Sequence, residues 1–183
     1  MNDFLILYTA QKDIVMDTIN KEGIYKVKRE YIKTKYKDVS NIFLNAYDWF
    51  VNNTSSMIDN KDRTYPIWTY YDLKYIEKHH DHKILKLKVP KDKAITFDSK
   101  KWNKILNQSY IEINVSDLEL FNSELKKYNL KHDSDAYMSN FYPLLKNKIQ
   151  KSWLRLFDDE IILSDVKQAA LFEIKKEWII EIF

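Results

Sequence analysis

The chain has 183 residues, of which 45% are hydrophobic and 31% are charged, and its formal net charge is +3. The absence of cysteine excludes disulfides, a zinc ribbon and a thiol nucleophile, and a single glycine, Gly23, excludes the glycine-rich loops that cradle nucleotide phosphates. There is no apolar run of about 18 residues, and the acidic N-terminus is unlike a signal peptide. We therefore expect one cytoplasmic domain over residues 1–183 without membrane association.

The first half of the chain predicts short strands separated by helices. Apolar residues at helical spacing predict two helices, at 13–22 and 38–51. Gly23 comes where the first of these helices needs a left-handed residue to end it. A charged loop is expected over 75–83. Apolar, β-prone or alternating segments predict strands at 4–9, 24–28, 65–71, 85–90 and 94–97.

The second half predicts mainly helices. Ser99 is expected to cap the first of them, and the sequence Ser-Asp-Leu-Glu at 116–119 has the form of a capping box. Ser164 is expected to cap the last helix, before a terminal strand. The expected helices are 99–108, 116–128, 143–157 and 164–176, and the strand is 178–183. The fold class is therefore α+β, with a small split or mixed β-sheet mostly in the first half and helices mostly in the second.

Several short motifs, in order along nearly the whole chain, resemble a bacterial family. They are Tyr-Thr-Ala-Gln at 8–11, Pro-Ile-Trp-Thr-Tyr-Tyr at 66–71, Ser-Trp-Leu-Arg-Leu-Phe-Asp at 152–158 and the segment 168–178, with support from 86–90 and 98–107. The family is domain of unknown function 3841, whose name implies no activity. Together with a lysine-rich composition typical of AT-rich codons, the resemblance implies a bacterial or phage setting.

The order of the elements in the first half also resembles the split-sheet fold of ADP-ribosyltransferases. These enzymes transfer ADP-ribose from NAD to a protein or a nucleic acid. The resemblance implies that polar residues of the first strand hold the adenosine ribose. In this sequence Thr9 and Gln11 would have that role, with Tyr8 beside them as a further residue of the NAD cleft. The first strand departs from those enzymes in lacking the Arg or His that commonly marks it.

The same resemblance implies residues for the reacting half of NAD. Trp68 and Tyr70 would support the nicotinamide, and Gln168, or else Glu173, would orient the ribose to which it is attached. The bond to nicotinamide breaks through an oxocarbenium-like state, which a nearby amide or carboxylate oxygen stabilises, and stacking fixes the pose. In those enzymes the late polar residue opens a strand, whereas the pattern around Gln168 predicts a helix.

Other clusters have a structural and a functional interpretation. The segment His-His-Asp-His at 79–82 is most simply a solvated loop, because with His132 as the only other histidine a ligand set is incomplete, and we expect no bound metal. Trp102, Trp153 and Trp178 fall in apolar stripes and are expected in the core. Trp68 and Tyr70 share one strand face. That face is expected to pack under a helix, with a stacking platform as the alternative.

Basic residues are treated in the same way. The lysines at 83, 86, 88, 91 and 93 are expected to mark the wet face of an edge strand, with binding of single-stranded nucleic acid or a phosphate-rich cofactor as the alternative. Arg155 is expected to pair with Asp158 or Asp159 across a helical turn, with pyrophosphate binding as the alternative.

The sequence therefore leads to two hypotheses of different classes. The first is an ADP-ribosyltransferase-like protein that binds NAD as its substrate, with no metal. It would modify a protein or nucleic-acid target in a toxin, defence or counter-defence setting, with an antitoxin or host defence protein as a further partner. The second is a non-catalytic inhibitor from a phage or mobile element, which would dock on a host protein or nucleic acid. A pocket at Trp68 and Tyr70 would favour the first, and an open convex face the second.

Overall fold

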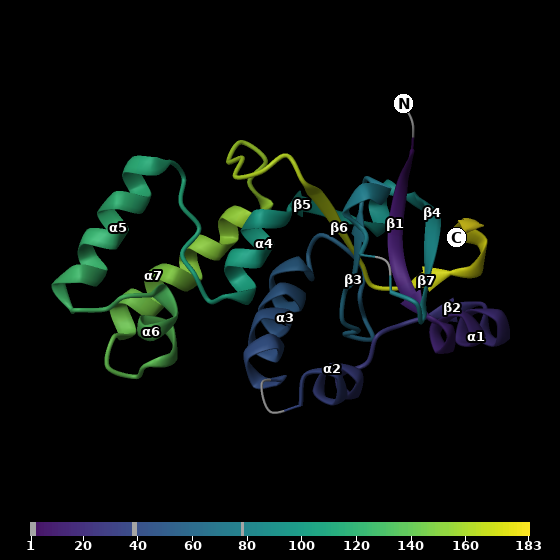
Figure 1. Cartoon of the computed structure of the whole chain (residues 1–183), viewed down its shortest axis with the longest axis horizontal. Helices are drawn as coiled ribbons and strands as arrows, with labels where there is room; N and C mark the ends of the chain where they lie inside the picture. The colour runs from purple at the N-terminus through teal and green to yellow at the C-terminus, as the bar shows by residue number, and fades with distance from the viewer. Residues whose placement is uncertain (1–2, 38–39, 78) are drawn as a thin grey trace. The chain divides into compact units, whose positions relative to one another are not determined.

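A computed structural model describes residues 3–37, 40–77 and 79–183 (Figure 1). The chain forms two compact units, one of residues Met1–Thr96 with Lys167–Phe183 and one of Phe97–Val166. The first unit contains most of the β-structure and the second is mainly helical, so the predicted α+β class is confirmed. Within the described ranges, no helix is both long and apolar enough to cross a membrane.

The sheet has the strand order β5-β6-β3-β1-β4-β8. Its strands are β1 (Phe4–Lys12), β3 (Ile67–Tyr70), β4 (His82–Pro90), β5 (Ile95–Asp98), β6 (Lys167–Leu171) and β8 (Ile179–Ile182). A separate ribbon pairs β2 (Ile24–Tyr25) with β7 (Ile174–Lys175). The predicted strands therefore form, although the one expected at 24–28 is shorter.

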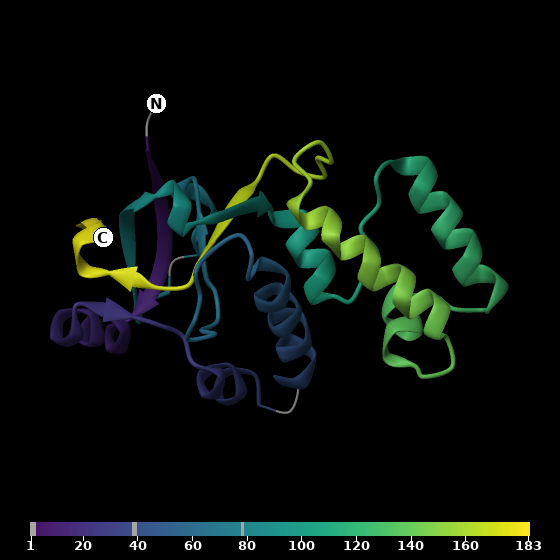
Figure 2. The same cartoon turned by 180° about the vertical axis from the view of Figure 1, so that it is seen from behind.

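Strand β1 is paired very differently on its two sides. With β4 it forms a continuous antiparallel ladder from Phe4 opposite Pro90 to Lys12 opposite His82, and both views show the two strands side by side (Figures 1 and 2). With β3 its register consists of one position, Tyr8 opposite Tyr70. The sheet is therefore tightly closed between β1 and β4, and it opens between the last residues of β1 and the first residues of β3.

Helices α1 (Asp13–Glu22), α2 (Arg29–Tyr36) and α3 (Ser40–Thr54) belong to the first unit. Helix α1 has the predicted bounds and ends at Gly23, whose φ of 77° is the left-handed conformation that glycine adopts without strain. Helix α2 was not predicted, because its sequence is almost entirely polar and has no apolar stripe. Helix α3 covers the predicted residues 40–51 and continues to Thr54, and the expected first two residues, 38 and 39, lie outside the described residues.

The second unit contains α4 (Ser99–Leu106), α5 (Val115–Lys127), α6 (Asp133–Met138) and α7 (Pro143–Ser152), followed by a 3₁₀ turn at Trp153–Phe157. Two predicted caps are wrong by one or two residues. Helix α4 is capped by Asp98, and α5 by Asn114, whose side chain accepts from the amide of Asp117 at 2.9 Å. In each case a residue with a suitable side chain precedes the predicted cap, and sequence spacing does not decide between them.

The helix predicted over 164–176 is wrong, because residues 167–171 form strand β6. Four consecutive side chains, Gln168 to Leu171, are buried there. A short run that is buried on both faces carries no period to separate a strand from a helix. Ser164 caps no helix, and its hydroxyl donates instead to Asp98 at 2.7 Å. The correction matters because it places Gln168 on a strand beside β3.

The lysine-bearing strand is also not an edge strand, because β4 lies between β1 and β8. Lys86 pairs with Glu181 of β8 at 3.0 Å, and Lys83 pairs with Asp13 at 3.1 Å. The expected wet face is present, since Lys86 and Lys88 alternate with the buried Leu85, Leu87 and Val89. Strand β8, which covers the edge, comes from the end of the chain and leaves no local signal in β4.

Asp98 is expected to make the second unit sensitive to acid. Its carboxylate accepts from the amides of Leu163 (2.7 Å), Ser164 (2.6 Å) and Lys100 (2.8 Å). Burial alone would raise the pKa of Asp98, but these bonds and the Ser164 hydroxyl outweigh burial and hold the pKa below 3.8. A depressed pKa contributes stability that is present above the unfolded value and is lost as pH falls through the folded value.

We therefore expect Asp98→Asn to lower the free energy of unfolding by about 1–3 kcal/mol at pH 7. The difference between parent and variant should shrink as the pH falls below about 4. Urea unfolding followed by circular dichroism at several pH values measures this, with the exposed Asp159→Asn as the matched control. A difference that stays constant down to pH 2 would contradict the argument.

Candidate functional site

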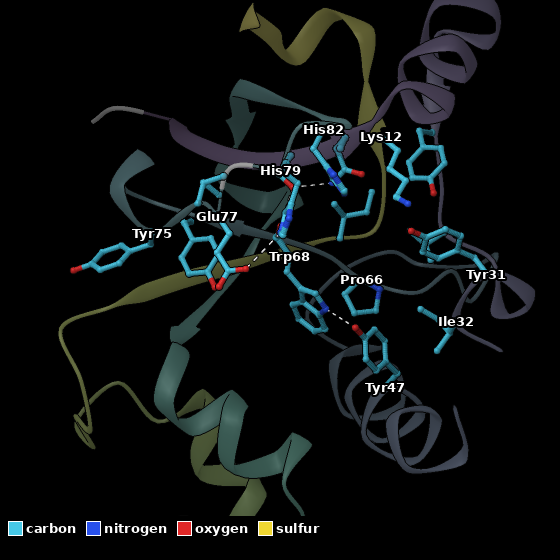
Figure 3. Close-up of a pocket in the computed structure, with 18 residues that line it drawn as sticks. Lys12, Tyr31, Ile32, Tyr47, Pro66, Trp68, Tyr75, Glu77, His79 and His82 are labelled. Atoms are coloured by element: carbon cyan, nitrogen blue, oxygen red, sulfur yellow. Dashed lines mark hydrogen bonds and ion pairs between the residues drawn. The ribbon is translucent and has the colours of Figure 1, made fainter. Parts of the chain in front are cut away.

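A cavity of about 320 Å³ lies in the first unit where β1 and β3 part (Figure 3). Sites for small ligands usually occupy roughly 300–1,000 Å³, so the cavity is large enough to take a substantial part of a nucleotide. Strands β1 and β3 contribute Thr9, Gln11, Trp68 and Tyr70 to its wall. The rest comes mainly from α2, α3 and the loop before β4, with Tyr31, Ile32, Tyr47, Tyr75, Glu77, His79 and His82.

Thr9 joins the two strands at the point where they separate. Its hydroxyl donates to the backbone carbonyl of Trp68 at 3.0 Å, and the Thr9 side chain is buried. The side-chain amide of Gln11 donates to the Thr9 hydroxyl at 2.8 Å. This chain of bonds fixes the orientation of Gln11 in the cavity wall, because the amide nitrogen is committed to Thr9.

Trp68 contacts helix α3 and the cavity at once. Its indole nitrogen donates to the hydroxyl of Tyr47 at 2.7 Å (Figure 3). Its ring meets the rings of Tyr47 and Phe50 edge to face, each at 5.4 Å between centroids. The strand face therefore packs under a helix at this point, as predicted, and Trp68 still lines the cavity. Its ring is held rigidly, which is what an oriented stacking surface requires.

Tyr70 is supported from the neighbouring strand by Gln168. The two residues lie opposite each other in the β3–β6 pairing. Burial raises the pKa of Tyr70, a hydrogen bond from Gln168 offsets part of this, and the charge of Glu77 adds to the rise. The hydroxyl of Tyr70 is therefore protonated at neutral pH and able to donate.

Gln168 itself is buried and is not among the residues that line the cavity. Its carbonyl oxygen has no hydrogen-bond partner within the described part of the chain, which is uncommon for a buried polar atom. Tyr8 also lies outside the lining, although it is directly opposite Tyr70. Glu173 lies elsewhere, 3.8 Å from Lys26 beside a different cavity. The structure thus gathers Thr9, Gln11, Trp68 and Tyr70 around one cavity, and Gln168 lies outside its lining, opposite Tyr70.

Sequence reasoning missed two groups of cavity residues. The first is the aromatic wall of Tyr31, Tyr47 and Tyr75, which comes from α2, α3 and a 3₁₀ turn at Leu73–Tyr75. The second is the set of basic side chains formed by Lys12, His79 and His82. The sequence shows the histidine loop as a cluster, but its position in the cavity lining depends on the β1–β4 register. Among the described residues, no group of three or more His, Cys, Asp or Glu side chains is arranged to hold a metal ion.

The prediction for Arg155 is wrong. Its guanidinium donates to Asp117 at 2.9 Å and to the carbonyl of Ile111, and it lies 5.0 Å from the centroid of the Tyr110 ring. Burial would raise the pKa of Asp117, but bonds from Ile113, Tyr110 and Arg155 hold it below its usual value. A 3₁₀ turn at 153–157 replaces the helix that would have brought Asp158 or Asp159 to the arginine. Arg155 therefore bonds to Asp117 in the first turn of α5 instead.

Comparison with known protein families identifies the family of this chain. The model of a domain of unknown function (DUF3841) matches residues 6–180. The chain belongs to that family. No curated protein and no solved structure matches it. Two of the motifs on which the resemblance rests, at 8–11 and 66–71, lie in the strands β1 and β3 that line the cavity.

Proposed function

We propose that this protein binds NAD in the cavity between β1 and β3 and transfers ADP-ribose to a protein or nucleic-acid target. The observation that carries the proposal is the convergence of Thr9, Gln11, Trp68 and Tyr70 on one cavity, with Gln168 opposite Tyr70 in the β3–β6 pairing. These side chains come from strands that are far apart in sequence, and each was assigned to NAD by the resemblance to ADP-ribosyltransferases.

The position of Gln168 adds support. The resemblance requires a late polar residue on a strand, and Gln168 is the second residue of β6. Because this residue acts on the cavity through Tyr70, we assign it a positioning role. Tyr70 is the group that would contact the nicotinamide half of the substrate.

In the proposed reaction, the bond between C1′ of the ribose and the nicotinamide nitrogen breaks, and its electron pair leaves with neutral nicotinamide. A nucleophilic atom of the target forms a new bond to C1′ and releases its proton to solvent. The rigid indole of Trp68 fixes the nicotinamide ring, and the Tyr70 hydroxyl donates a hydrogen bond that orients the departing half. Gln11, held by Thr9, is placed to bind ribose hydroxyls.

The alternative of a non-catalytic inhibitor is less well supported. That hypothesis needs Trp68 and Tyr70 on an open face where a partner can dock. Instead they line a cavity, and Trp68 is bonded to Tyr47. We propose a cytoplasmic protein that acts in bacterial or phage conflict as a toxin, defence or counter-defence factor, with an antitoxin or host defence protein as a possible partner.

The test is incubation of the purified chain with NAD labelled in its adenylate half and a bacterial lysate. We expect label in macromolecules, and sensitivity to protease or nuclease identifies the target class. Gln168→Ala should transfer less, because Tyr70 loses its supporting bond, whereas Lys167→Ala, at an exposed site on the same strand, should match the parent. No transfer in any lysate, together with no NAD binding by calorimetry, would refute the proposal.

A further inference from the structure

The end of the β1–β4 ladder places basic groups on one wall of the cavity. Lys12 and His82 are the last pair of the ladder, and residues directly opposite in an antiparallel pair project from the same face. The ring of His79 lies 5.2 Å from that of His82 between centroids, and all three residues line the cavity. Three side chains that can carry positive charge therefore converge at one end of it (Figure 3).

Asp81 determines which ring nitrogen of His82 is available to a ligand. Its carboxylate lies 2.7 Å from Nδ1 of His82, and this hydrogen bond is the main cause that holds the pKa of Asp81 below its usual value. An ionised carboxylate only accepts, so Nδ1 carries a proton, and in the imidazolium form Nε2–H is the donor left to meet an anionic ligand. A carboxylate that orients a histidine in this way keeps the ring in one position.

Two carboxylates oppose an anion at this end. Glu77 lies 3.5 Å from Nε2 of His79, and Asp81 lies 3.4 Å from the ammonium of Lys12. Both contacts are long and involve exposed side chains, so they contribute little and His79 and Lys12 can turn to a ligand. The short bond from His82 to Asp81 is not in competition, because it uses the other ring nitrogen.

Much of the remaining lining is aromatic. Trp68 and Tyr47 are bonded to each other, and the rings of Tyr70 and Tyr75 lie 6.2 Å apart between centroids. A ligand that satisfies both kinds of lining must combine a flat ring with a compact anionic group. That combination describes a nucleotide, with its ring against the aromatic residues and its phosphate against the basic ones.

We infer that Lys12, His79 and His82 bind the phosphate of a nucleotide held in this cavity, with Asp81 orienting His82 for that contact. The inference rests on the proposed function in taking the cavity as a nucleotide site, and it assigns the phosphate end, which the resemblance leaves without a residue. It predicts that these three residues act on the phosphate, whichever flat ring, nicotinamide or adenine, lies against the aromatic residues.

The experiment is calorimetric titration of the full chain with ADP, with inorganic pyrophosphate and with adenosine. For ADP we expect His82→Gln and Lys12→Met each to raise the dissociation constant by roughly tenfold, which is the effect of losing one charge-assisted hydrogen bond. Adenosine binding should change less than about twofold, because the aromatic residues that contact the ring are unchanged in these variants. The matched controls are His80→Gln and Lys83→Met, at residues outside the lining.

Every outcome decides the matter. Loss confined to phosphate-bearing ligands and to the His82 and Lys12 variants supports the inference. Equal loss for ADP and adenosine, equal effects of the control variants, or no binding of ADP or pyrophosphate by the parent would overturn it. The proposed transfer is scored separately with NAD and lysate. ADP binding that depends on His82, without any transfer, would support the phosphate site and reject the transferase. Transfer that is unchanged in the His82 variant would support the transferase and reject the phosphate site.

Discussion

Replacing Tyr70 by phenylalanine is expected to lower the rate of ADP-ribose transfer about 100-fold, which is the usual effect of removing one preorganised hydrogen-bond donor from a reacting centre. The hydroxyl is protonated because burial raises its pKa, and Gln168 fixes its direction from β6. The ring of Tyr70 remains in the variant, so stacking and cavity shape are preserved. The measurement is the rate of nicotinamide release and of label transfer at saturating NAD.

Tyr75→Phe is the matched control, because Tyr75 lines the same cavity and its ring lies 6.2 Å from that of Tyr70. We expect it to retain most of the transfer rate. Thermal unfolding of both variants shows whether the fold is intact, since Tyr70→Phe leaves the buried Gln168 amide without its acceptor. A Tyr70→Phe protein that transfers at the parent rate would remove Tyr70 from the reaction.

The largest effect on stability is expected from Trp153→Ala. The Trp153 side chain is fully buried, its indole nitrogen donates to the carbonyl of Ser109 at 2.8 Å, and its ring stacks on that of Tyr137 at 5.1 Å. Its removal should lower the free energy of unfolding of the second unit by about 3–5 kcal/mol, from lost burial and the cavity left behind. Urea unfolding followed by circular dichroism measures it.

Leu154→Ala is the control for that experiment, because the adjacent Leu154 side chain is exposed. A change below about 0.5 kcal/mol is expected for such a surface site. If the two substitutions lower the free energy of unfolding equally, Trp153 would not be the centre of this core.

The three tryptophans assigned to packing from the sequence, Trp102, Trp153 and Trp178, are all buried.

The elements that local sequence predicted best have a complete local signal. Helix α1 combines an apolar stripe with the glycine that ends it, and both of its bounds were predicted. Strand β6 and helix α2 show the opposite situation. Strand β6 is buried on both faces, so its apolar run has no period. Helix α2 is mostly polar, and the buried Ile32 and its packing against α3 define it. Their states are decided by neighbours that are distant in sequence.

The candidate site could be predicted only in part, because only some of its residues lie in segments with a clear local signal. Thr9, Gln11, Trp68 and Tyr70 lie in two short motifs, so a resemblance was able to name them before their contact was known. Other lining residues come from elements whose positions follow from sheet register and helix packing. Even the noticed histidine loop could not be assigned to the cavity, because its place follows from Lys12 standing opposite His82.

The uneven pairing of β1 has a consequence for local stability. The ladder with β4 spans the whole of β1, whereas the seam with β3 has one register position, so β3 separates from β1 at a lower cost in free energy than β4 does. The cavity lies at that seam. A molecule that contacts both of its walls binds only the closed form, and it therefore raises the free energy of this opening by the free energy of its own binding. Protection of the β3 amides against hydrogen exchange would report occupancy, while the amides shared by β1 and β4 would stay protected throughout.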